Sequence, residues 1–178
     1  MGESTKLKFK EKEYIARCIN RAKNKNNKFF REKDFELEAG KGHLLWNYIY
    51  SNLKYTFRSN NKFSVGYIQN HAWKQIYMYN KFEKELYLIL SESTFTRIMK
   101  QKKEQHLIAA LANVNDGDLE RINHKYRAEL LKLEEIPKRS TIIVFDYDAS
   151  FKKGTYKSIM ITPNLLEVES EEWMINKG

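Results

Sequence analysis

Three neighbouring segments of this chain repeat their residue pattern with a period of two, which predicts β-strands. They cover residues 63–67, 73–79 and 85–90, and only short connections separate them. Connections this short favour antiparallel neighbours, because a parallel pair needs a crossover of a dozen or more residues. We therefore expect an antiparallel meander at the centre of the chain.

Segments with helical spacing of apolar residues lie on both sides of this meander. One helix is expected over about 10–23, before a polar loop at 24–28, and a second helix over about 43–57. Further helical runs follow the meander: Ser91 or Ser93 can cap the first of them, and Pro137 ends the last. The helices therefore fall into an N-terminal group and a central group.

A second group of β-segments follows the central helices. Residues 141–148 are apolar on both faces in the middle, as in a central strand, and shorter β-segments follow at 156–161 and 165–168. Trp173 lies in a short acidic tail. This order predicts an α+β protein with a mainly antiparallel mixed sheet of about five to six strands. We expect helices packed on one side of the sheet, together with an N-terminal helical segment.

The division of the chain follows its composition. Residues 1–38 are expected to form a basic N-terminal arm and helix, and residues 39–178 the α+β domain. Hydrophobic residues make up 42% of the chain, which is too rich for disorder, and no apolar run approaches a membrane span. No signal peptide is expected, and the single cysteine, Cys18, excludes an internal disulfide and a cysteine-rich zinc site. We expect a protein of the host cell cytoplasm, without membrane partners.

Charge is distributed unevenly along the chain. Residues 1–103 carry 22 Lys or Arg and 10 Asp or Glu, whereas residues 104–178 carry 10 and 13. No Asp or Glu occurs in residues 39–82, which hold six basic and 11 aromatic residues. Lysine, asparagine and isoleucine usage of this kind is also typical of an AT-rich genome, which accounts for part of the lysine excess. The acid-free segment is explained least well by that bias.

Cations and aromatic rings are what a nucleic acid needs, because cations bind phosphates and unpaired bases stack on rings. The alternatives are that the rings belong to the core and that the basic helix face is simply solvated. We expect nucleic acid, or a protein complex that handles it, to bind the following residues: Arg17, Arg21, Lys54, Arg58, Lys62, Tyr67, Trp73, Lys74, Tyr77 and Tyr79.

One pair of carboxylates points to catalysis instead. Asp146 and Asp148 lie two residues apart at the end of a β-segment, and strand-end carboxylates hold Mg²⁺ or Mn²⁺ in many nucleases. The alternative is ordinary strand-end chemistry, because the Glu-x-Lys that a restriction-type nuclease carries on its next strand is missing. No nucleotide-binding, hydrolase or zinc-protease motif occurs, so we expect neither a metal nor another cofactor.

Several motifs resemble those of an uncharacterised domain of low-GC Gram-positive bacteria and their phages. They are Trp73-Lys74-Gln75-Ile76-Tyr77, the stretch from Glu85 to Phe95, the stretch from His106 to Asn115, and Ile143-Val144-Phe145-Asp146-Tyr147-Asp148 with Trp173. The resemblance covers roughly residues 63–173. It implies an accessory protein of a mobile element and supplies no catalytic residues.

Two classes of function follow. The first is a non-catalytic binder, which either holds nucleic acid or blocks a host defence nuclease in the manner of an anti-CRISPR or anti-restriction protein. In the blocking form, the acidic segment from Glu167 to Glu172 could imitate phosphates. The alternative class is a metal-dependent nuclease that uses Asp146 and Asp148. A homodimer that associates through the aromatic face is a further possibility.

Overall fold

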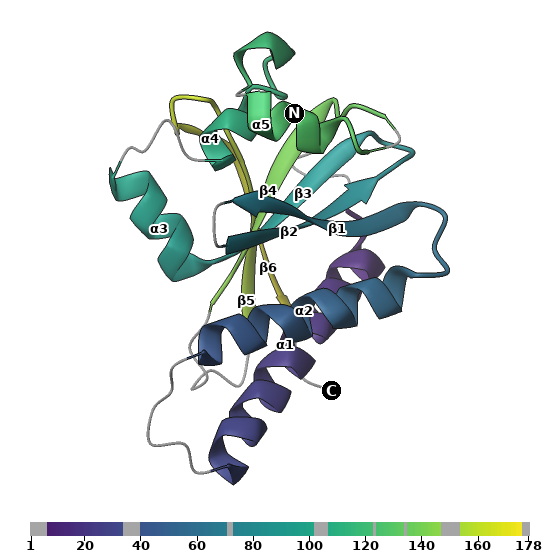
Figure 1. Cartoon of the computed structure of the whole chain (residues 1–178), viewed down its shortest axis with the longest axis vertical. Helices are drawn as coiled ribbons and strands as arrows, with labels where there is room; N and C mark the ends of the chain where they lie inside the picture. Colours follow the sequence, from purple (N-terminus) through teal and green to yellow (C-terminus); the bar gives the residue numbers. More distant parts are fainter. Residues whose placement is uncertain are drawn as a thin grey trace.

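The structure is a computed structural model that describes residues 7–33, 40–70, 73–101, 107–122, 124–133, 135–146 and 154–175. Two helices come first, three strands follow, a helical segment leads on, and three more strands end the described chain (Figure 1). In order, the elements are α1 (Phe9–Glu32), α2 (Lys41–Phe57), β1 (Phe63–Asn70), β2 (Trp73–Asn80), β3 (Glu85–Ser91), α3 (Glu92–Gln101), α4 (Leu107–Ala112), the 3-10 helix η1 (Leu119–Arg121), α5 (His124–Leu130), β4 (Arg139–Phe145), β5 (Gly154–Ile161) and β6 (Glu167–Ile175).

The six strands form one mixed sheet in the order β1-β2-β3-β4-β5-β6. All neighbouring pairs are antiparallel except β3 and β4, which run parallel. The parallel pair is joined by the segment that contains α3, α4 and α5, as a crossover of this length allows. The predicted α+β class and the mainly antiparallel mixed sheet are confirmed.

Helices cover both faces of the sheet and enclose two hydrophobic cores. Leu86, Leu88 and Leu90 of β3 pack under α3–α5, whereas Tyr87 and Ile89 point to the opposite face and pack under α1 and α2. All seven residues of β3 are buried, as a central strand requires. The central helices thus lie on one side, as expected, and the N-terminal helical segment covers the other side (Figure 1).

Helices α1 and α2 form an antiparallel hairpin, and side-chain amides fasten it. Asn26 Nδ2 donates to the backbone oxygen of Lys41 at 3.1 Å, and Asn52 Nδ2 donates to that of Cys18 at 3.0 Å. Burial of Asn26, which is 1% exposed, explains why α1 continues through the predicted loop at 24–28 and ends at Glu32. A tertiary contact overrides the weak helix propensity of the asparagines here.

The predicted acidic tail is the edge strand β6. Trp173 is 8% exposed, stacks on Tyr156 at a centroid distance of 4.7 Å, and donates from Nε1 to Ser158 Oγ at 3.0 Å. Tyr156 in turn reaches α1, where its hydroxyl contacts Asn20 Oδ1 and the backbone oxygen of Ala16. The end of the described chain therefore closes the core beneath α1.

The buried hydroxyl of Tyr156 predicts alkaline sensitivity. Burial raises the pKa of Tyr156 in the folded state, so the unfolded chain, whose tyrosines titrate near 10, loses the proton first. Its contribution to the free energy of unfolding is full below about pH 10 and declines as the pH rises further. At pH 7 we expect the free energy of unfolding of Tyr156→Phe to be about 1 kcal/mol lower than that of the wild type. Above pH 10 the free energy of unfolding of the variant should fall less steeply than that of the wild type, by about 1.4 kcal/mol per pH unit.

Urea unfolding at intervals from pH 7 to pH 11 measures this effect. The control is Tyr55→Phe, because the Tyr55 side chain is 66% exposed. Removing this exposed hydroxyl group should leave the slope of the free energy of unfolding against pH at the wild-type value. Equal slopes for Tyr156→Phe and the wild type would show that another group sets the alkaline limit.

Candidate nucleic-acid interface

Helix α1 carries a row of cations on its exposed side. Arg17, Arg21, Lys25 and Lys28 are all exposed and follow one another at spacings of three or four residues, which places them on one helix face. Only the ends of the row have acidic partners on the helix: Glu13 binds Arg17 at 2.6 Å, and Glu32 lies 3.6 Å from Lys28. Like charges at this spacing destabilise a helix slightly, so the row gains from an anionic ligand.

Helix α2 carries tyrosines whose rings lie beside cations. Lys25 of α1 lies 4.6 Å from the ring centre of Tyr48, which joins the two helices at their outer surface. Lys54 lies 5.4 Å from the ring of Tyr50. At the end of the helix, the Arg58 guanidinium lies 4.2 Å from the ring of Tyr55. Each exposed contact of this kind contributes about 0.5–1 kcal/mol and holds the cation near its ring.

The sheet continues this arrangement at its β1 edge. Tyr67 of β1 is 41% exposed, and its ring centre lies 5.8 Å from that of Tyr50 and 4.5 Å from Lys74 Nζ on β2. Direct side-chain contacts therefore join α1 to α2 at Tyr48, and α2 to the sheet at Tyr50. We call this part of the molecule the basic-aromatic surface, and it comprises Arg17, Arg21, Lys25, Lys28, Tyr48, Tyr50, Lys54, Tyr55, Arg58, Tyr67 and Lys74.

Strand alternation separates the aromatic residues that were predicted to act together. Tyr67 and Lys74 share the α1/α2 face of the sheet, whereas Tyr77 and Tyr79 point to the opposite face. Tyr79 is 1% exposed and belongs to the core, so its ring is not available to a base, and its assignment to the binding surface is wrong. Tyr77 is half-buried over Gly66, where an added Cβ would lie 2.4 Å from the tyrosine hydroxyl.

The predicted cation Lys62 stands apart from this surface. Lys62 donates to Glu11 Oε1 at 2.7 Å, and both side chains are more than four-fifths buried, so this lysine fastens α1 to the start of β1. The side chain of Trp73 lies outside the described part of the structure. The remaining predicted cations, Arg17, Arg21, Lys54, Arg58 and Lys74, do belong to the basic-aromatic surface. Five further residues of the surface were not predicted, although the spacing of the α1 cations was a usable signal: Lys25, Lys28, Tyr48, Tyr50 and Tyr55.

Three carboxylates of the acidic strand β6 form ion pairs with cations of this chain. Glu169 accepts from Arg139 at 2.8 Å, Glu172 from Lys157 at 2.8 Å, and Glu171 from Lys12 of α1. Carboxylates that are paired internally and spread along a strand are poor imitations of a phosphate row. The structure therefore weakens the expectation that this segment acts as a phosphate mimic.

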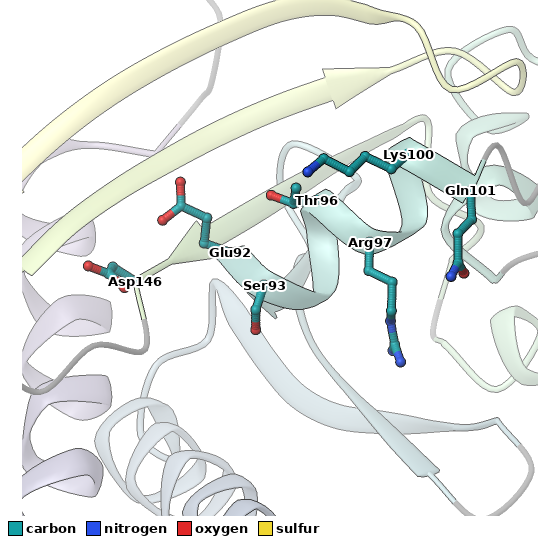
Figure 2. A pocket seen from close by; sticks show the side chains of 7 residues that line it. All are labelled: Glu92, Ser93, Thr96, Arg97, Lys100, Gln101 and Asp146. Atoms are coloured by element: carbon teal, nitrogen blue, oxygen red, sulfur yellow. The ribbon is translucent and has the colours of Figure 1, made fainter.

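Asp146, the residue after β4, lines an open cavity of about 530 Å³ (Figure 2). The cavity lies where the parallel strands β3 and β4 end, a place where open α/β sheets commonly bind ligands. Its lining consists of Glu92, Ser93, Thr96, Arg97, Lys100 and Gln101 of α3 together with Asp146. Figure 2 shows Asp146 and Glu92 toward one end and Gln101 at the other.

The predicted metal pair can be followed only in part. Asp148 lies outside the described residues, and the Asp146 backbone oxygen accepts from Lys23 Nζ at 2.8 Å. Among the residues that the structure describes, no three His, Cys, Asp or Glu side chains gather closely enough to hold a metal ion. The described part of the chain likewise contains no helix with the length and hydropathy of a membrane span.

The comparisons with known proteins bear on family and not on activity. No curated protein and no solved structure matches the chain. The sequence profile of one family, described as a family of unknown function (DUF5986), matches residues 4–143, which include α1, α2, the β1–β3 meander and most of β4. The match begins well before residue 63, where the motifs of the resemblance start, and it includes helix α1 with its row of cations. The chain belongs to this family of unknown function, DUF5986.

Proposed function

We propose that this protein binds single-stranded nucleic acid without catalysis, through the basic-aromatic surface. The observation that carries the proposal is the repeated pairing of a tyrosine with a cation. The exposed rings of Tyr55 and Tyr67 lie beside Arg58 and Lys74, and the half-buried ring of Tyr50 lies beside Lys54. Each pair offers a ring for a base and a charge for the adjoining phosphate. The row on α1 adds further cations beside them.

Exposed rings favour a single strand over a duplex. In a duplex the base faces are stacked on one another, whereas an unpaired base can stack on tyrosine with a gain of about 1–3 kcal/mol. The absence of Asp and Glu from residues 39–82 keeps repulsive charge out of α2, β1 and β2. Because neither rings nor phosphate contacts read base edges, we expect weak sequence preference.

Fluorescence anisotropy with labelled 20-nucleotide DNA and RNA strands, and with the matching duplexes, tests the proposal. We expect binding to both single strands, weaker binding to the duplexes, and a linear fall of log K with log salt between 50 and 300 mM. Four to six phosphate contacts would give a slope of about −3 to −4. Failure to bind any single strand at 50 mM salt would contradict the proposal.

The sequence motifs also bear on the biological setting. The motif resemblance suggests an accessory protein of a mobile element, acting in the host cytoplasm on nucleic acid or on a defence complex that handles it. The inhibitory form predicts that the protein slows a nuclease while binding none of the free nucleic acids. The internal pairing of Glu169, Glu171 and Glu172 gives that form less support than direct binding.

A metal-dependent nuclease is the second candidate function. Its support is that Asp146 and Glu92 line the same open cavity at the ends of β3 and β4. Incubation of plasmid and RNA with the protein in Mg²⁺ or Mn²⁺ tests it against the variant Asp146→Asn with Asp148→Asn. Cleavage by the wild type alone would establish this function, and intact substrates in both reactions would dismiss it.

A further inference from the structure

The two edges of the sheet differ in how they are protected against pairing with another strand. β6 carries Glu167, Glu169, Glu171 and Glu172, and its register with β5 shifts between Met160 and Ile161. Charges and irregularities of this kind discourage association at an edge. β1 reads Phe-Ser-Val-Gly-Tyr-Ile-Gln-Asn, without charge or proline, and pairs with β2 in unbroken register over eight residues. Only β1 is therefore suited to accept a further strand.

The hydrogen-bonding phase of β1 shows which groups face outward. Lys81 N donates to Lys62 O at 2.8 Å, and alternate residues of an antiparallel pair form such bonds, so Ser64, Gly66 and Ile68 bond to β2. The N–H and C=O groups of Phe63, Val65 and Tyr67 consequently point away from β2. β1 is the terminal strand of the described sheet, so these groups lie on its outer edge. Phe63 is 3% exposed, so the accessible part of this edge is at Val65 and Tyr67.

We propose that β1 pairs antiparallel with β1 of a second copy of this chain, about a twofold axis near Gly66. Two copies of a charged strand would bring like charges close together, and β1 contains no charge to cause that repulsion. Pairing about Gly66 sets Val65 against the partner's Tyr67, a combination of β-branched and aromatic side chains that stabilises sheets. It also places the two Gly66 residues where backbones approach closely.

The symmetry has a consequence for the basic-aromatic surface. A twofold axis that joins two edge strands antiparallel stands perpendicular to the sheet, so both α1/α2 faces lie on the same side. Tyr67 of each copy then lies within the new strand pair and Lys74 lies on the strand beside it, so the two surfaces become continuous. The dimer itself is independent of nucleic acid, whereas the joint surface rests on the proposed function.

Light scattering of the full chain, without nucleic acid, tests the dimer. We expect a mass of twice 21.3 kDa at tens of micromolar protein. Because both copies carry a net charge of +9, the dimer should tighten as salt rises, opposite to the expected salt dependence of nucleic-acid binding. A mass of 21.3 kDa at every concentration and salt would overturn the proposal, whatever the anisotropy experiment shows.

Substitutions at Val65 locate the interface. Val65→Pro removes an outward N–H and leaves the bonds to β2 in place, so we expect the monomer mass. Val65→Thr keeps both the N–H and the branched shape and should stay dimeric. If Val65→Pro fails to fold, Ser64→Lys places a cation on the same edge and should also shift the mass to that of the monomer. A dimer that persists in the folded edge variants would contradict pairing through β1.

Discussion

Replacing Arg139 by methionine is expected to lower the free energy of unfolding by about 3 kcal/mol. The Glu85 carboxylate is fully buried, where Tyr87 and Thr141 hydroxyls donate to it at 2.6 Å and Arg139 lies 3.5 Å away. Removing the cation leaves a buried charge without a counter-ion, which typically costs about 3–5 kcal/mol. The lower end applies because the ion pair is long and the Arg139 side chain is 21% exposed.

A second substitution separates charge from packing. Adding Glu85→Gln to Arg139→Met removes the buried charge. The amide keeps an oxygen for one of the two hydroxyls and presents its NH2 group to the other, so we expect this change to recover about half of the lost stability. Arg121→Met is the matched control, since Arg121 is 76% exposed in its pair with Asp118 and should cost less than about 1 kcal/mol. Urea unfolding measures all four proteins. No gain from Glu85→Gln in the Arg139→Met background would place the cost in packing.

Removing three cations from the basic-aromatic surface is expected to weaken single-strand binding about 100-fold at 0.1 M salt. The variant combines Lys54→Gln, Arg58→Gln and Lys74→Gln, which leaves every tyrosine in place. The loss of three phosphate contacts should make the slope of log K against log salt shallower by about 2. If the variant and the wild type bind equally at 1 M salt, this difference in slope amounts to about 100-fold in affinity at 0.1 M. The effect should be equal for DNA and RNA, because phosphates are common to both.

The control variant loses the same charge elsewhere. Arg127, Lys132 and Lys138 are exposed and lie in α5 or between α5 and β4, outside the basic-aromatic surface. Changing these three to glutamine should reduce affinity less than about threefold. An equal loss of affinity in both variants would mean that net charge alone attracts nucleic acid. Unchanged affinity in both variants would show that the basic-aromatic surface does not bind it. Tyr55→Ala tests stacking separately. It should weaken the binding free energy by about 1–3 kcal/mol and leave the slope of log K against log salt unchanged.

Local patterns predicted the central elements well. The period-two repeats of 63–67, 73–79 and 85–90 became β1, β2 and β3, and the doubly apolar run at 141–148 became the buried strand β4. These predictions held because burial on one or both faces constrains residues that are close in sequence. The polar loop predicted at 24–28 was wrong because the contact that orders Asn26 comes from Lys41, a residue beyond the next connection.

The candidate site was predicted in composition and not in arrangement. The acid-free segment identified the right part of the chain, yet counting aromatics could not separate the core ring of Tyr79 from the exposed ring of Tyr67. The distinction depends on the face of the sheet: Tyr79 points under α3–α5, whereas Tyr67 lies on the face that α1 and α2 cover. The cations of α1 joined the same surface only because the hairpin brings Lys25 against Tyr48.

The sequence by itself determined the class of the fold, the order of its elements and the cationic, aromatic character of its first half, because each follows from side-chain type and spacing. Tertiary structure alone decided that cations and rings from α1, α2, β1 and β2 meet on one surface and that β6 pairs its carboxylates internally. It also decided that β1, rather than β6, offers an open edge. These features join residues far apart in the chain, and their pairing depends on packing that no local pattern encodes.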